Sequence, residues 1–135
     1  MNRNKLFFTF FISLILFWQG GILASRPPGL VENIASAIHS GDSRELSKYF
    51  NSSVELVLPG NDGVFSKAQA EMIMKTFFAK SAPISFNIKQ KGNSTGGAQF
   101  IIGSYKSKAE SLNVYILLKP INGVLMIHQM HFEAD

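Results

Sequence analysis

The chain has 135 residues, with 13 basic and 9 acidic side chains, a formal net charge of +4 and no cysteine. This length allows one domain and is too short for two. The absence of cysteine excludes disulfides, thiolate catalysis and cysteine-ligated metal sites.

The first 24 residues have the order of a secretory signal peptide. Arg3 and Lys5 give a positive start, residues 6–18 are apolar apart from two hydroxyl side chains, and Ala24 offers a small residue for cleavage. The apolar run is shorter than the roughly 20 residues of a spanning helix. We therefore expect cleavage and export to the periplasm or cell envelope, with no stable membrane span afterwards. Retention as an anchor is the alternative if the residues up to Ala24 are counted in the apolar run.

Cleavage would leave residues 25–135 as a single domain. Both basic residues of the leader would be lost, so the net charge would fall to +2, from 11 basic minus 9 acidic side chains. A charge this small does not favour a nucleic-acid partner. An exported domain without disulfides must also be stabilised by its core alone.

Two helices are expected before the first strand. Residues 30–40 carry an apolar stripe at helical spacing, and Gly41 suits the position just past a helix end. Asp42, with Glu45 three residues later, fits a capping pattern for a short second helix. The apolar side of this second helix would consist of Leu46, Tyr49 and Phe50.

A strand, a turn and a third helix follow. Residues 53–58 alternate between apolar and polar, which predicts a strand. Residues 59–63 have turn chemistry, with a brief return strand after them. Ser66 and Gln69 form a capping box, and the helix that they begin is expected to end near Lys80.

The last third of the chain predicts four consecutive strands. Its apolar runs are rich in β-branched and aromatic residues, and Gly, Asn, Pro and Ser separate them. Short connections make neighbouring strands antiparallel. The four expected strands span residues 84–91, 98–106, 112–119 and 124–132. The element order thus predicts an α+β domain, with helices packed on one face of a curved antiparallel sheet.

Several short motifs accompany this order. They are residues 37–42 (AIHSGD), 49–51 (YFN), 66–71 (SKAQAE), 77–78 (FF), 96–97 (GG), 102–103 (IG), 114–115 (VY) and Lys119. With them the chain resembles the nuclear transport factor 2-like (NTF2-like, cystatin-like) fold, a cone of curved sheet around helices. More narrowly, it resembles a family of small exported Bacteroidota proteins known only as a domain of unknown function.

The resemblance implies the fold, and it implies that the protein is exported. It implies no activity, because one fold can carry many functions. Members of that family often have a His near position 89 and an Arg just before the Val-Tyr pair. Lys89 and Asn113 occupy those places here, so a site built from that His and Arg would be absent from this chain.

Three histidines are the first residues to consider as ligands or bases. His39 falls in the last turn of the first helix, where the helix dipole favours a cation. His128 and His131 are three apart on the last strand and should point to opposite faces, so they cannot jointly hold one metal ion. We expect no metal site and no cofactor, and we assign no catalytic residue.

His128 is the most informative of the three. Counting by twos along the strand groups it with Val124, Met126, Met130 and Phe132 on an apolar face. If that face lines the cone, His128 would be a lone titratable group in an apolar pocket, as general bases often are. We favour a core histidine hydrogen-bonded to a backbone carbonyl or a neighbouring hydroxyl.

Tyr115 is a candidate neighbour of His128. A two-residue turn at Asn122 and Gly123 would place Tyr115 on the same face, whereas a three-residue loop would place Val114 there. The candidate pocket inside the cone comprises Phe77, Tyr115, Met126, His128 and Met130.

The third and fourth strands of the sheet are apolar on both faces. Helices can cover only one of these faces, and the other would be an exposed apolar surface. Because two-fold dimers are the commonest assembly, we expect a homodimer that packs sheet to sheet.

Three functions are compatible with these features. The sequence favours an exported non-enzymatic domain that dimerises and holds a small apolar ligand in its cone. The first alternative is a small-molecule isomerase, dehydratase or hydrolase with His128 as its base. The second is a domain that binds or inhibits another protein.

Overall fold

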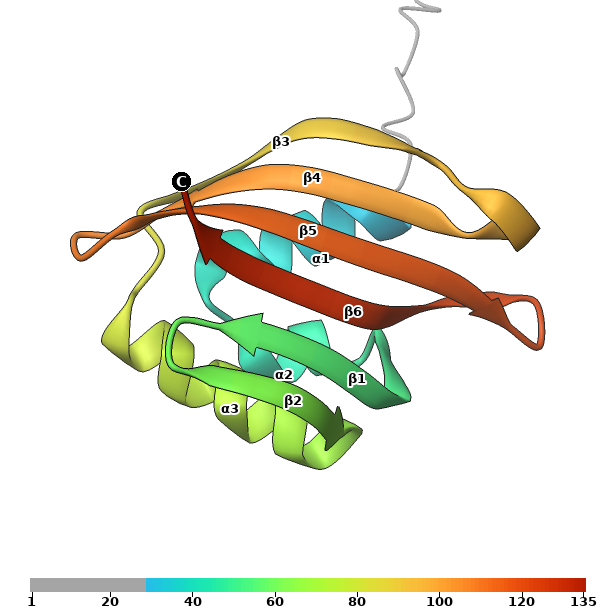
Figure 1. Cartoon of the computed structure of the whole chain (residues 1–135), viewed down its shortest axis with the longest axis horizontal. Helices are drawn as coiled ribbons and strands as arrows, with labels where there is room; N and C mark the ends of the chain where they lie inside the picture. The colour runs from blue at the N-terminus through green and yellow to red at the C-terminus, as the bar shows by residue number, and fades with distance from the viewer. Residues whose placement is uncertain (1–28) are drawn as a thin grey trace, which may run out of the picture.

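The structure is a computed structural model, and it describes residues 29–135. The expected signal peptide, residues 1–24, lies outside the described residues. Helices pack on one side of a curved six-stranded sheet (Figure 1). The helical elements are α1 (Leu30–Ser40), α2 (Ser43–Ser47), α3 (Lys67–Lys80) and the short 3₁₀ turn η1 (Thr95–Gly97). The strands are β1 (Phe50–Leu58), β2 (Asn61–Ser66), β3 (Ser85–Asn93), β4 (Gln99–Lys106), β5 (Ser111–Ile121) and β6 (Val124–Ala134).

The predicted end of α1 and the predicted starts of α2 and α3 are confirmed. Gly41 ends α1 in the left-handed conformation, with φ of 66°. The Asp42 carboxylate accepts a hydrogen bond of 3.0 Å from the Glu45 backbone N–H at the start of α2. Ser66 and Gln69 form both bonds of a capping box at the start of α3. Within residues 29–135, no helix has the length and apolar character needed to cross a membrane.

The end of α2 corrects one expectation. The helix ends at Ser47, so Tyr49 and Phe50 lie beyond it, and β1 begins at Phe50. Phe50 is fully buried and pairs with Ile127 of β6. A strand partner far away in the sequence therefore determines the conformation of Phe50, and the local helical spacing does not.

The sheet order is β2-β1-β6-β5-β4-β3. The predicted meander of β3, β4, β5 and β6 is confirmed, with antiparallel pairing throughout. β1 pairs with β6 in parallel, so the sheet is mixed rather than wholly antiparallel. No short connection joins these two strands, and nothing local therefore fixes their relative direction.

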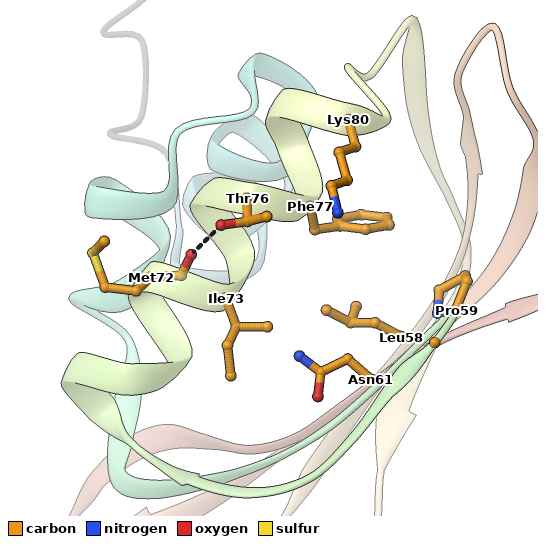
Figure 2. A pocket seen from close by; sticks show the side chains of 9 residues that line it. Leu58, Pro59, Asn61, Met72, Ile73, Thr76, Phe77 and Lys80 are labelled. Atoms are coloured by element: carbon orange, nitrogen blue, oxygen red, sulfur yellow. Dashed lines mark hydrogen bonds between the residues drawn. The ribbon is translucent and has the colours of Figure 1, made fainter.

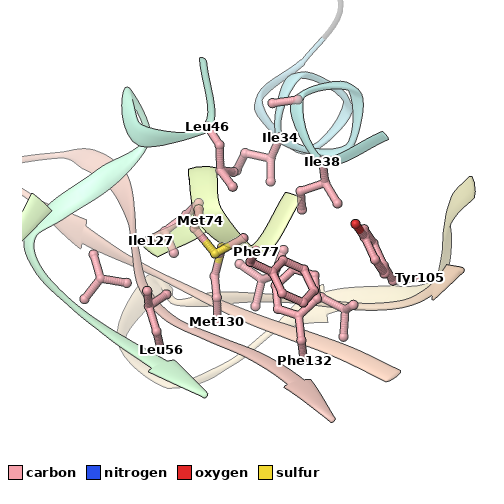
Figure 3. Close-up of a cluster of buried hydrophobic side chains, with 14 of the residues drawn as sticks. Ile34, Ile38, Leu46, Leu56, Met74, Phe77, Tyr105, Ile127, Met130 and Phe132 are labelled. Carbon is pink, nitrogen blue, oxygen red and sulfur yellow. The ribbon is translucent and has the colours of Figure 1, made fainter. Parts of the chain in front are cut away.

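The core fills the space between the helices and the concave face of the sheet (Figure 3). Its centre is a cluster of three aromatic rings, contributed by α3, β4 and β6. The ring centroids of Phe77 and Phe132 are 5.2 Å apart, and those of Tyr105 and Phe132 are 5.5 Å apart. The interior of the cone is thus occupied by packed side chains.

Two β-bulges interrupt the antiparallel meander, and the β1–β6 pairing has a further register shift between Phe50 and Glu55. In β5 and β6, Leu118 pairs with Ile127 but Leu117 pairs with Gln129, which leaves His128 as an extra residue. In β3, Lys89 is the extra residue of a second bulge. Such bulges increase the twist of a sheet and help it to curve. The β5–β6 turn is the two-residue alternative, with positive φ at both of its central residues.

Candidate functional site

The bulge at His128 separates this histidine from Met130 and Phe132, with which counting by twos had grouped it. Ile127 and Met130 are both fully buried in the core although they are three residues apart. His128 and Gln129 together oppose Leu117, on the sheet face that is turned away from the helices. Counting by twos fails here because the extra residue shifts every later side chain by one position.

The imidazole of His128 is half-buried and lies near a positive charge. Burial, and then the nearby Lys119 ammonium, lower the pKa of His128 below its ordinary value. Its Nε2 atom is buried and has no hydrogen-bond partner among the described residues. The imidazole is therefore neutral at neutral pH, and a base in this position would still need a second polar group close to it.

The five candidate pocket residues do not line one cavity. Phe77 and Met130 belong to the core. Tyr115 lies on the opposite face of the sheet, with its ring 5.9 Å from that of His131. Met126 and His128 are half-buried near the first half of β6, outside the core.

A broad apolar surface covers the sheet face turned away from the helices. In Figure 1 the helices lie behind this face. Cross-strand pairs place Ile102 beside Tyr115, and Phe100 beside Leu117. Met126 pairs with Lys119 on the same face. We call Phe100, Ile102, Tyr115, Leu117 and Met126 the uncovered face; each of these side chains is half-buried.

Charged groups surround the uncovered face. His131 Nε2 lies 3.3 Å from Glu55 Oε1, a contact that joins β6 to β1. The same nitrogen has no partner of hydrogen-bond geometry among the described residues. Lys119 and Glu133 are exposed at opposite ends of the face.

A separate cavity of about 380 Å³ lies between α3 and the β1–β2 turn (Figure 2). Its lining consists of Leu58, Pro59, Gly60, Asn61, Met72, Ile73, Thr76, Phe77 and Lys80. The sequence reasoning missed this site apart from Phe77. One signal for it existed, because Met72, Thr76 and Lys80 follow one another at intervals of four along α3, beside the buried stripe of the helix.

The described residues contain no group of three His, Asp or Glu side chains that could hold a metal ion. The structure presents two candidate surfaces, the uncovered face and the α3 cavity.

The arrangement of helices and sheet is that of the NTF2-like proteins, as the resemblance implied. An NTF2-like protein of unknown function from Cytophaga hutchinsonii matches with a TM-score of 0.56 at 12% identity, covering 78% of this chain and 86% of that chain. A putative polyketide cyclase from Sinorhizobium meliloti matches with a TM-score of 0.60 at 9% identity, covering 79% and 95%. At such identities the likeness establishes the fold alone.

The family model of the domain of unknown function DUF4783 matches residues 31–133, and the chain belongs to this family. A DUF4783 protein from Bacteroides uniformis is 25% identical, with a TM-score of 0.75, covering 79% of this chain and 98% of that chain. One from Bacteroides ovatus is 29% identical, with a TM-score of 0.72, covering 76% and 93%. No curated protein matches the chain.

Proposed function

We propose that this protein is an exported, non-enzymatic domain that pairs with a second copy of itself through the uncovered face. The observation that carries the proposal is the apolar character of this face along β4 and β5, to which β6 adds Met126. Contiguous apolar surfaces of this kind are typical of interaction sites. A stable interface takes about 800 Å² from each partner.

The charges around the face favour a second copy as the occupant. Lys119 lies at one end of the face and Glu133 at the other, with Tyr115 and Leu117 between them on β5. A two-fold pairing that runs the two faces in opposite directions brings Lys119 of each copy near Glu133 of the other. The apolar centre then meets its own equivalent, as a self-complementary interface requires.

Binding of a small ligand is the second element of the proposal. The centre of the cone is filled by the rings of Phe77, Tyr105 and Phe132, which argues against a ligand at that depth. The cavity between α3 and the β1–β2 turn favours a shallower position for the ligand, at the edge of the cone.

Replacing Leu117 by Lys tests the pairing. Leu117 is already half-buried in the single chain, so covering the part that remains exposed contributes about 1 kcal/mol. A two-fold interface counts each substitution twice, so L117K should weaken self-association at least tenfold. Sedimentation velocity over a range of protein concentrations should show a dimer for the unchanged protein and a monomer for L117K. The matched control is Ile84→Lys, because Ile84 is 60% exposed and precedes β3, away from the uncovered face.

Two outcomes would contradict the pairing. The first is that the unchanged protein sediments as a monomer at every concentration. The uncovered face would then bind a different protein and not a second copy. The second is L117K dimerising as strongly as the unchanged protein, which would place the interface elsewhere.

A further inference from the structure

The α3 cavity combines an apolar wall with a polar edge. Leu58 and Phe77 are buried, and Ile73 is half-buried beside them. Met72 is 59% exposed and forms an apolar lip. A ligand in this cavity would therefore bury an aliphatic body against side chains from both α3 and β1.

The polar edge offers hydrogen-bond donors and one positive charge. Lys80 lines the cavity and forms no salt bridge with the described residues. The side-chain amide of Asn61 also lines it and makes no hydrogen bond within residues 29–135. Thr76 already donates its hydroxyl hydrogen to the Met72 carbonyl, at 3.2 Å. Figure 2 shows Lys80 and Asn61 reaching toward the space between α3 and the β1–β2 turn.

The charges at the cavity are of one sign, because no carboxylate lines it. Lys80 lies in the last turn of α3, where the helix dipole favours a cation. An ammonium and an amide that face one opening are suited to a carboxylate, because charge-assisted hydrogen bonds are the strongest of the ordinary ones.

We propose that the α3 cavity binds a small amphiphilic carboxylate, with its aliphatic chain against Leu58, Ile73 and Phe77 and its carboxylate at Lys80. The cavity volume of about 380 Å³ lies at the low end of ligand sites, which measure roughly 300–1,000 Å³, so the aliphatic chain is short. This inference rests on the ligand-binding part of the proposed function and is independent of the pairing through the uncovered face.

The test is a titration of the ¹⁵N-labelled protein with octanoate, followed through the backbone amide resonances. Octanol provides a neutral molecule with the same apolar body. We expect octanoate to shift the resonances of Gly60, Asn61 and Thr76, and to bind about tenfold more tightly than octanol. Shifts confined to other parts of the molecule would place binding outside the cavity and overturn the proposal.

Replacing Lys80 by Met keeps an aliphatic chain in place and removes the charge. K80M should weaken octanoate binding about tenfold and leave octanol binding unchanged. The matched control is Lys75→Met, because Lys75 is an exposed lysine of the same helix that does not line the cavity. A third variant, Thr76→Trp, fills the opening and should abolish the shifts at Gly60 with either molecule.

The possible results distinguish two claims: that the cavity binds a ligand, and that this ligand is a carboxylate. Equal affinity for octanoate and octanol, unaffected by K80M, would overturn the carboxylate and leave the ligand-binding part of the proposed function standing. Absence of cavity shifts with both molecules would overturn both. Octanoate shifts that survive in the Thr76→Trp variant would also overturn the assignment to this cavity.

Discussion

Tyr105 provides a sharp test of whether the interior of the cone is structural. Its ring is fully buried among the aromatic side chains of the core. Its hydroxyl donates a hydrogen bond to the backbone carbonyl of Ser81, directly after the last residue of α3. Burial, and then the negative charge of Glu110, raise the pKa of Tyr105 far above its ordinary value, so the phenol is neutral at all working pH values.

Replacing Tyr105 by Phe keeps the ring and removes the hydroxyl alone. The carbonyl of Ser81 would lose its donor, and Ser81 is itself buried. A buried acceptor without a partner costs about 1–3 kcal/mol. The free energy of unfolding should therefore fall by about 2 kcal/mol, which for a domain of this size lowers Tm by roughly 10 °C.

Urea unfolding followed by circular dichroism measures this difference. Tyr49→Phe is the matched control, because Tyr49 is half-buried and its hydroxyl makes no hydrogen bond with the described residues. Y49F should change the free energy of unfolding by less than about 0.5 kcal/mol. If Y105F were as stable as the unchanged protein, or more stable, the hydroxyl would be serving a ligand rather than the fold.

Three further outcomes are expected. Ser66→Ala removes the α3 capping box and should lower the free energy of unfolding by about 1 kcal/mol in thermal unfolding; no change would refute this role. Gly103→Ala should strongly lower the free energy of unfolding, because a Cβ atom there would lie 2.7 Å from the Phe86 ring and 2.9 Å from the Asn87 carbonyl oxygen. The pKa of His128 is lowered in the folded state, so the unfolded state binds the proton first, and stability should fall as pH drops below about 6.5. His128→Gln should flatten this dependence in urea titrations at several pH values, and an unaltered pH slope would contradict the assignment.

Local signals in the sequence were sufficient to predict most of the helices and strands. The capping residues Asp42 and Ser66 predicted where two helices begin. The apolar runs and the turn residues between them in the last third of the chain predicted the meander. These features depend on neighbours within a few residues. Because these features do not require knowledge of distant strand pairing, the sequence predicted them and the structure confirms them.

Features that depend on distant pairing were not predictable in the same way. The parallel alignment of β1 with β6 brings together segments about 75 residues apart, as the partners Leu56 and Met130 illustrate. The bulge at His128 is not marked by a Gly or Pro in the sequence, and it places this residue on a different face from Met130 and Phe132. The α3 cavity depends on how far the β1–β2 turn lies from the helix, a distance that the spacing of Met72, Thr76 and Lys80 along α3 does not encode.

The most direct test of the central claim is the mass of the purified protein under native conditions, compared with its mass after denaturation. Self-association through the uncovered face predicts a native mass of twice that of the single chain. Any further mass that denaturation removes would be a bound ligand of the α3 cavity. A native mass equal to that of one chain, at every concentration measured, would contradict the pairing.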